Sequence, residues 1–467
     1  MSALFRQSPA EDRKTAEARG LPGRTNPNRT AAAPAPAPAP ARIVRSRAEW
    51  PYPASLALPN LLSILEWPSP NCAEGNPNAR QHPARKEAAS TGVPRRPGHP
   101  SPPRNGGNFS HGTMKRIPGT RISTGLAVAM LLSVASAEAQ TVKLPACGAE
   151  IRKTSVSGLS SGAFMTSQLY VAFSEIMVGA GIVAGGPYLC AKSWAGNSLL
   201  VNATTTCMHP LTAGSGPNTP LLARYAATLA EYGQIAPLKN LEDDRIYIFS
   251  GTRDEIVTTT VVNQTREFFK AVGVPEASIR YDRSIAAGHA FLTDDDTDTA
   301  CALTRSPYIN DCDFSQAGAI LEQIYPGLKS PARHRDDSLI AFDQEEFIDS
   351  PYTSMDDTAY AYVPTACRSG KSCPVHVVFH GCRQGSHFIG DQYYARTGYN
   401  RLAEANDLIM LYPQVRPSSA SPLNPDGCWD FWGYSSPDSP TPDYFTRNAP
   451  QLRAIHKMIA RLAEPRS

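Results

Sequence analysis

The feature that most restricts the fold is the pentapeptide Gly158-Leu159-Ser160-Ser161-Gly162, which stands between a predicted strand and a predicted helix. Residues 151–157 include the β-branched Thr154 and the apolar Val156, and residues 163–177 place apolar side chains at helical spacing. A serine in Gly-x-Ser-x-Gly at a strand-to-helix turn is typical of a nucleophile elbow, because the glycines permit a turn too tight for larger side chains. The motif also occurs by chance, and its alternative is an ordinary Gly/Ser turn.

Strand-like and helix-like segments alternate along the rest of the chain. Strands are predicted at residues 181–185, 245–251, 279–285, 359–363, 375–379 and 408–412, and helices at residues 259–272, 399–406 and 450–463. This alternation predicts the α/β class, with a mostly parallel sheet and helices on both faces.

The first 139 residues differ in composition from the remainder. Residues 1–113 are rich in Pro, Ala and Arg, and such a segment buries too little apolar surface to fold. Residues 114–139 combine basic side chains, an apolar run over 126–135 and the small-x-small sequence at 137–139, which together indicate a signal peptide. The alternative is a buried core helix, and the apolar run is too short for a membrane span.

The predicted organisation therefore has three parts. Residues 1–113 are a disordered or mis-assigned upstream extension; we expect Met114 to be the true start, and the alternative is a genuine disordered leader. Residues 114–139 are a signal peptide, and residues 140–467 form a single catalytic domain. Nine of the ten cysteines lie after residue 140, which favours disulfides and a secreted or periplasmic location. The net charge of +3 is too small to attract nucleic acid or an anionic membrane strongly. We also expect no cofactor.

An acid and a histidine follow later strands at the places that serine hydrolysis requires. Asp254 comes just after the strand at 245–251, and His289 follows the strand at 279–285. The order Ser160, Asp254, His289 is that of α/β-hydrolases, so the serine would attack an ester carbonyl, the histidine would take its proton and the aspartate would orient the ring. The rivals are Ser161 as nucleophile and Asp243, Asp244 or Glu255 as the acid.

The oxyanion hole needs a second amide besides that of Ser161, from a loop after an early strand. The best candidate is His380-Gly381-Cys382, which follows the strand at 375–379 but comes after His289 in the chain. The simplest interpretation is a circular permutation that has moved the early strands to the C-terminal part. Cys382 would then provide the second oxyanion amide.

Five stretches carry a family resemblance, namely residues 155–162, 184–188, 306–309, 380–382 and 424–430. With them, the chain from Thr141 to Ala463 resembles the secreted poly(3-hydroxybutyrate) depolymerases that have a circularly permuted α/β-hydrolase domain. The resemblance implies a triad of Ser160, Asp254 and His289, oxyanion amides from Ser161 and Cys382, and a hydrophobic polyester or oligoester substrate. No separate polymer-binding domain is recognised.

The resemblance also implies roles for aromatic residues and cysteines. Trp429, Trp432 and Tyr188 resemble substrate-binding residues, although core packing is the alternative for the tryptophans. Connectivity of the cysteines does not follow from sequence. The resemblance supports the pairs Cys190–Cys207, Cys301–Cys312, Cys367–Cys373 and Cys382–Cys428, which leaves Cys147 odd and Cys72 in the leader.

Other chemistries deserve comparison with this interpretation. Zinc ligands are conceivable at Cys367, Cys373, His376 and His380, and calcium ligands at Asp294, Asp295, Asp296 and Asp298. We expect no metal, because the two histidines lie on a predicted strand and the aspartates fit a solvated loop. The rival functions are a feruloyl or acetyl esterase acting on plant polysaccharide and a non-catalytic secreted binding protein.

Overall fold

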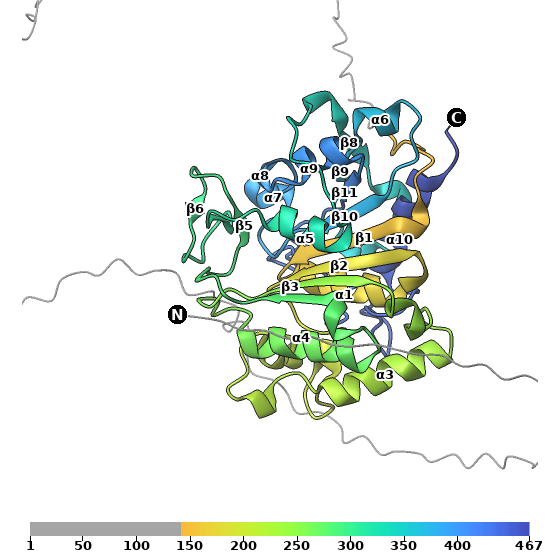
Figure 1. Ribbon diagram of the computed structural model, residues 1–467. Coiled ribbons are helices and arrows are strands. Elements are labelled where there is room, and N and C mark those ends of the chain that lie inside the picture. Colours follow the sequence, from red (N-terminus) through yellow and green to blue (C-terminus); the bar gives the residue numbers. More distant parts are fainter. Residues whose placement is uncertain (1–141, 467) are drawn as a thin grey trace, which may run out of the picture. The chain divides into compact units, whose positions relative to one another are not determined.

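The computed structural model describes residues 142–466, so the predicted upstream extension at 1–113 and signal peptide at 114–139 lie outside the described residues. An eight-stranded sheet with the order β4-β3-β2-β1-β10-β11-β9-β8 forms the centre of this part (Figure 1). Its strands are β1 Thr154–Leu159, β2 Met177–Val183, β3 Arg245–Phe249, β4 Ile279–Asp282, β8 Leu339–Asp343, β9 Thr358–Tyr362, β10 Val375–Phe379 and β11 Ile409–Tyr412. A small second sheet has the order β5-β7-β6, with β5 Phe291–Thr293, β6 Thr299–Ala300 and β7 Ile309–Asp311.

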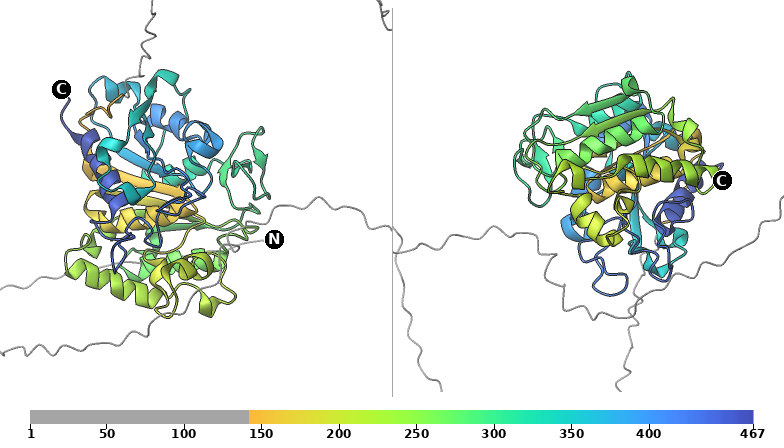
Figure 2. Two further views of the ribbon diagram at one scale, coloured as in Figure 1. Left: turned by 180° about the vertical axis from the view of Figure 1, so that it is seen from behind. Right: turned by 90° about the horizontal axis from the view of Figure 1, so that it is seen from below.

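The main sheet is mostly parallel, as the alternation predicts. β1 pairs in parallel with both β2 and β10, while β9 pairs antiparallel with both β11 and β8. Helices flank the sheet, and α3 and α4 lie together on one side of it (Figure 2). They are α1 Ser161–Ala172, α2 Leu199–Val201, α3 Thr219–Glu231, α4 Thr259–Ala271, α5 Gln316–Ile324, α6 Thr365–Arg368, α7 Ser386–Ile389, α8 Gln392–Arg396, α9 Tyr399–Asn406 and α10 Pro450–Ala463.

The order of the strands confirms the circular permutation. The chain enters the sheet at its centre with β1, builds outward to β4, and later returns from the opposite edge to place β10 beside β1. The segment before β1 is hydrogen-bonded to the end of α10, with the amides of Cys147 and Ala149 each 3.0 Å from Leu462 O. Figure 1 shows these two segments side by side. The closing helix therefore ends where an unpermuted chain would continue into β1.

The boundary between α1 and β2 differs from the prediction. The sequence predicts a helix over 163–177 and a strand over 181–185, but α1 ends at Ala172 and β2 already begins at Met177. The glycines Gly179 and Gly181 weaken the sequence signal of β2, because glycine is uncommon within strands. Close packing requires a small residue here, since a Cβ at Gly181 would lie 2.6 Å from Ile320 Cγ2 of α5. The strands of the second sheet were not predicted, since two or three residues are too few for a periodic pattern. The five-residue β8 was not predicted either.

Four disulfides join eight of the nine described cysteines, in the pairings that the family resemblance implies: Cys190–Cys207, Cys301–Cys312, Cys367–Cys373 and Cys382–Cys428. Cys147 is free and buried. The zinc alternative is excluded for Cys367 and Cys373, because their sulfurs are bonded to each other. The last pair connects the segment after β10 to the segment before Trp429.

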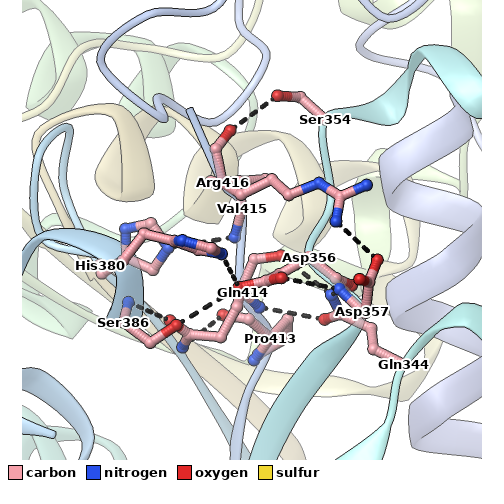
Figure 3. A network of polar contacts seen from close by, with 11 residues as sticks. Gln344, Ser354, Asp356, Asp357, His380, Ser386, Pro413, Gln414, Val415 and Arg416 are labelled. Atoms are coloured by element: carbon pink, nitrogen blue, oxygen red, sulfur yellow. Dashed lines mark hydrogen bonds and ion pairs between the residues drawn. The ribbon is translucent and has the colours of Figure 1, made fainter. Parts of the chain in front are cut away.

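A buried polar network ties the segments that follow β8 and β11 to the start of β9 (Figure 3). The Gln344 side-chain amide donates to Asp356 O and Gln414 O at 2.6 and 2.9 Å, and its oxygen accepts from Gln414 N at 3.0 Å. At the surface, Arg416 forms an exposed ion pair with Asp357 at 2.7 Å. The Gln344 bonds satisfy backbone groups of Asp356 and Gln414, which lie just outside β9 and β11.

Candidate active site

Ser160 lies at the turn between β1 and α1, in the strained conformation of a nucleophile elbow. Its φ and ψ angles are 58° and −123°, which few residues other than glycine adopt. The amide of Ser160 donates to Val183 O of β2 at 3.0 Å, so the strained residue is held by the neighbouring strand. The turn leaves the side chain at the carboxyl end of the sheet, 7% exposed.

The two glycines of the motif are sterically required. A Cβ at Gly158 would lie 2.4 Å from Gly162 O, and a Cβ at Gly162 would lie 2.4 Å from His380 O. Real Cβ atoms do not approach oxygen so closely, so a larger residue at either position would displace the backbone. The motif therefore allows α1 to begin directly against the end of β10.

Asp254 and His289 form a buried pair. The Asp254 Oδ2 atom lies 2.8 Å from His289 Nδ1, and both side chains are almost fully buried. The other carboxylate oxygen accepts from the amides of Ile256 and Val257 at 2.9 and 3.0 Å, which fixes its orientation. Because the carboxylate only accepts, Nδ1 carries a proton and the neutral ring presents Nε2 as a base.

The segment from Ala287 to Cys312, here called the base arm, holds the histidine. The amide of His289 donates to Thr304 Oγ1 at 2.8 Å, and Gly288 N donates to Cys301 O at 2.9 Å. The loop after β3 is bonded to the start of this arm, since Arg253 N donates to Ala287 O at 3.1 Å. The loops that carry Asp254 and His289 therefore support each other.

Ser160 and the Asp254–His289 pair share the carboxyl edge of the parallel strands, with β2 between β1 and β3. Within residues 142–466, no hydrogen bond joins Ser160 Oγ to His289, and His289 Nε2 has no protein partner. Catalytic hydrogen bonds are often long in a free enzyme and shorten when substrate binds. The ring thus keeps one nitrogen available for proton transfer.

The loop of residues 380–385 lies against the serine, and it is called the oxyanion loop here after its predicted role. A Cβ at Gly381 would be 3.3 Å from Ser160 Cβ, so Gly381 allows this approach. His380 is buried, and its Nδ1 lies 2.7 Å from Gly381 O. Its Nε2 accepts from Val415 N at 3.3 Å (Figure 3). Burial lowers the pKa of His380 to about 4, which keeps the ring neutral as these two bonds require.

Two backbone amides remain available at the serine. Across residues 142–466, neither the Ser161 amide nor the Cys382 amide donates a hydrogen bond. The Gly381–Cys382 peptide is planar, so its N–H points away from the carbonyl that His380 holds. These are the two groups that the sequence predicts for an oxyanion hole, and both N–H groups are unpaired within the described residues.

The aromatic residues differ from expectation. Trp429 and Tyr188 are fully buried, so they form part of the core behind the site and offer no surface to a substrate in this structure. Trp429 packs on Phe379 with ring centroids 4.8 Å apart, and Tyr188 OH donates to Phe445 O at 2.8 Å. Trp432 alone of the three is partly exposed. A large aromatic side chain stabilises the fold when it packs in the core. The sequence pattern does not show whether such a side chain packs there or lines a binding site.

Asp430 fixes the turn that carries Trp432. Its carboxylate accepts from the amides of Trp432, Gly433, Tyr434 and Ser435 at 2.6–3.2 Å and also from the Ser435 hydroxyl. The side chain is buried, and burial raises the pKa of Asp430 although these donors oppose the shift. Sequence reasoning missed this role, because an aspartate beside a tryptophan has no signal of its own.

Of the rival acids, Asp244 lies elsewhere, and within residues 142–466 the side chains of Asp243 and Glu255 form no hydrogen bond or ion pair. Asp244 precedes β3, and its carboxylate accepts from Tyr170 OH at 2.9 Å, at the other end of the strand from Asp254. Among the described residues, no group of three or more His, Cys, Asp or Glu side chains is arranged to hold a metal ion. No helix within residues 142–466 is long and apolar enough to cross a membrane.

The strand order, the strained serine and the buried Asp–His pair define an α/β-hydrolase. No family model matches the chain. The chain is 40% identical over 346 residues to the poly(3-hydroxybutyrate) depolymerase of Delftia acidovorans, which covers 73% of this chain and 65% of that protein. It is 35% identical over 324 residues to the polyhydroxybutyrate depolymerase of Talaromyces funiculosus, which covers 66% of this chain and 90% of that protein.

Two solved structures are similar as well. The crystal structure of the PHB depolymerase from Penicillium funiculosum has a TM-score of 0.61 and 33% identity, and the match covers 69% of this chain and 99% of that one. A serine-to-alanine PHB depolymerase complexed with an R3HB trimer has a TM-score of 0.60 and 32% identity at the same coverage. The chain belongs to the poly(3-hydroxybutyrate) depolymerase family. It spans just under two thirds of the Delftia protein, at 65%.

Proposed function

We propose that the chain is a serine carboxylic-ester hydrolase that cleaves poly(3-hydroxybutyrate) or its oligomers through an acyl-enzyme. The observation that carries this proposal is the buried Asp254–His289 pair, whose free Nε2 lies at the sheet edge that holds Ser160 and two unpaired amides. The family supports the substrate, since one structural relative is described with an R3HB trimer bound. Trp432 is the candidate side chain for contact with the polyester.

Each residue then has a defined step. Ser160 Oγ attacks the ester carbonyl while His289 Nε2 takes its proton, and Asp254 stabilises the imidazolium through Nδ1. The amides of Ser161 and Cys382 bind the oxygen that becomes negative in the tetrahedral intermediate. The protonated His289 gives its proton to the departing alkoxide oxygen of the polymer, which leaves as an alcohol. Water that His289 activates then hydrolyses the acyl-enzyme and restores Ser160.

Ser160→Ala against Ser161→Ala tests the nucleophile with a matched pair. Both changes remove one hydroxyl from the same turn, and Ser161→Ala keeps its backbone amide. We expect Ser160→Ala to abolish release of soluble hydroxybutyrate products from an amorphous polymer suspension, while Ser161→Ala loses far less. Full activity of Ser160→Ala would refute the proposal. Hydrolysis of feruloyl or acetyl esters without hydrolysis of polymer would instead favour the plant-polysaccharide esterase.

We infer in addition that the catalytic domain is exported. Four disulfides among the described residues are typical of an oxidising compartment, and the segment at 114–139 has the pattern of a signal peptide. N-terminal sequencing of the protein from culture medium and periplasm tests this directly. We expect a mature end just after Ala139, and a mature end upstream of Met114 would contradict both the start site and the signal.

A further inference from the structure

Gln384 occupies an unusual place in the oxyanion loop. It is 1% exposed, and its side-chain oxygen accepts from Gly381 N at 2.7 Å. Its side-chain nitrogen donates to Pro307 O and Tyr308 O, both at 3.0 Å, and these carbonyls belong to the base arm. The single amide group therefore bonds the loop beside Ser160 and the arm that holds the histidine.

On the loop side, Gln384 determines which amide is free. Gly381 N is occupied by the Gln384 oxygen, while Gly381 O is held by His380 Nδ1 at 2.7 Å. With both polar groups of Gly381 fixed, the next amide, that of Cys382, is the one left to bind an oxyanion. A Cβ at Gly381 would lie 2.7 Å from Gln384 Oε1, so the glutamine closes on this glycine without space between them.

In the base arm, Gln384 bonds a carbonyl that is also bonded to a residue close to His289 in the sequence. Tyr308 O accepts from Phe291 N at 2.9 Å as well as from Gln384, and Phe291 stands two residues after His289. Tyr308 has a φ angle of 57°, a conformation that persists only where surrounding contacts hold it. The Gln384 amide supplies one of those contacts.

We propose that Gln384 is a positioning residue that sets the distance between the oxyanion amide of Cys382 and the base His289. This inference rests on the proposed esterase function. The two groups come from segments far apart in the chain, and the Gln384 side chain bonds both. Its loss would let each segment shift independently, and small displacements of catalytic groups cost rate because the transition state requires all of them at once.

Two substrates distinguish an effect of Gln384 on the oxyanion amides from an effect on proton transfer by His289. An alkyl ester such as a hydroxybutyrate oligomer leaves as an alkoxide and needs a proton from His289, whereas p-nitrophenolate leaves without one. Both substrates need the oxyanion amides. A residue that positions both groups should therefore affect the oligomer more strongly than the p-nitrophenyl ester, and should affect kcat more than KM.

The test compares Gln384→Met with Gln344→Met in the mature chain. Gln344 is an equally buried glutamine that also accepts one backbone amide and donates to two carbonyls, but its partners are in the segments after β8 and β11 (Figure 3). We expect similar losses of Tm in the two variants. Only Gln384→Met should lower kcat, by about tenfold for p-nitrophenyl butyrate and by about 100-fold for a hydroxybutyrate trimer, with KM within twofold.

The outcomes are distinguishable. If Gln384→Met keeps kcat within twofold of the unaltered chain while its Tm falls, the glutamine is only structural and the inference is wrong. If Gln384→Met does not fold, Gln384→Asn decides by the same criteria, because it keeps the amide but is one methylene too short to reach both segments. Absence of hydrolysis by the unaltered chain would refute the proposed function itself, whereas an active chain with an unaffected Gln384→Met would refute only the positioning role.

Discussion

The same strand carries serines into two different clusters with histidine. In the middle of β1, Ser155 and Ser157 bond to the two ring nitrogens of His376 on β10, at 2.6 and 2.8 Å. At the end of β1, Ser160 lies at the sheet edge with His289, which is bonded to Asp254. One cluster lies within the sheet and the other lies where the strands end.

The difference lies in what each ring leaves unpaired. His376 uses both nitrogens on serine hydroxyls, and those hydroxyls also contact Tyr325 and Tyr399. Burial lowers the pKa of His376 to about 3, so the ring stays neutral. His289 uses one nitrogen on a carboxylate that can stabilise its cation, and the other has no partner within residues 142–466. A histidine with a carboxylate and a free nitrogen can exchange protons, and a fully bonded neutral one maintains structure.

The largest expected effect comes from His289→Asn. The asparagine amide replaces Nδ1 as donor to Asp254, so the buried carboxylate keeps a partner, but Nε2 is lost. We expect kcat for p-nitrophenyl butyrate to fall by about 10⁴-fold or more with little change in Tm. His376→Asn is the matched control and should retain kcat per folded molecule. A His289→Asn variant with more than a few per cent of the original kcat would break the comparison.

The second effect is on stability. Replacing His376 by Leu removes two hydrogen bonds to buried hydroxyls, and we expect the free energy of unfolding to fall by about 2–4 kcal/mol. Urea unfolding followed by circular dichroism measures this change. Activity corrected for the folded fraction should stay unchanged, because His376 contacts no group at the sheet edge. A loss of corrected activity would show that the two clusters are coupled.

The sequence distinguishes these clusters only in part. Ser160, Asp254 and His289 each follow a predicted strand, and the shared edge of parallel strands brings such residues together, so the candidate set follows from order and position. His376 also lies near serines in space, but its partners are more than 200 positions away, at separations of 221 and 219 residues. Such a contact depends on register between β1 and β10, which no local pattern specifies.

The fold was predictable where the order of strands and motifs along the chain indicates it. Features that depend on contacts between distant segments were not predictable. The permutation follows from finding the strand and His380-Gly381-Cys382 after His289, and the strand order agrees. Burial of Trp429 was not predictable, because the same side chain can pack in a core or line a cleft. Gln384 gave no signal either, since its two bonding partners lie in segments that only the folded chain brings together.

The third prediction concerns the acid side of the stability curve. In the unfolded chain His376 binds a proton below about pH 6.5, but in the folded chain it does so only near pH 3. Stability should therefore be complete above pH 6.5 and should fall as the pH drops below it, by about 1.4 kcal/mol for each pH unit from this residue. His376→Leu should remove that part of the slope. An unchanged slope in urea unfolding between pH 4 and pH 6.5 would contradict the burial argument.

The smallest effect is a pH dependence of stability whose sign is opposite to that of His376. It comes from Asp244, the buried aspartate just before β3, whereas the buried Asp254 follows that strand. Burial raises the pKa of Asp244 to about 7, although its bond with Tyr170 opposes the shift. The folded chain then keeps a proton that the unfolded chain loses near pH 3.9, so this contribution to stability is present at low pH and is lost as the pH rises to about 7.

Asp244→Asn should remove this downward trend between pH 4 and pH 7, so that the variant gains stability over the unaltered chain as the pH rises. The pH-dependent change is slightly smaller than the one at His376, because the pKa of Asp244 moves from 3.8 to about 7, whereas that of His376 moves from 6.5 to about 3. Urea unfolding at several pH values measures it. Since Asp244 lies at the far end of β3 from the catalytic edge, kcat should be unchanged, whereas Asp254→Asn should lose it. If Asp244→Asn and Asp254→Asn lost kcat equally, the position of a buried aspartate before or after β3 would not determine whether it takes part in catalysis.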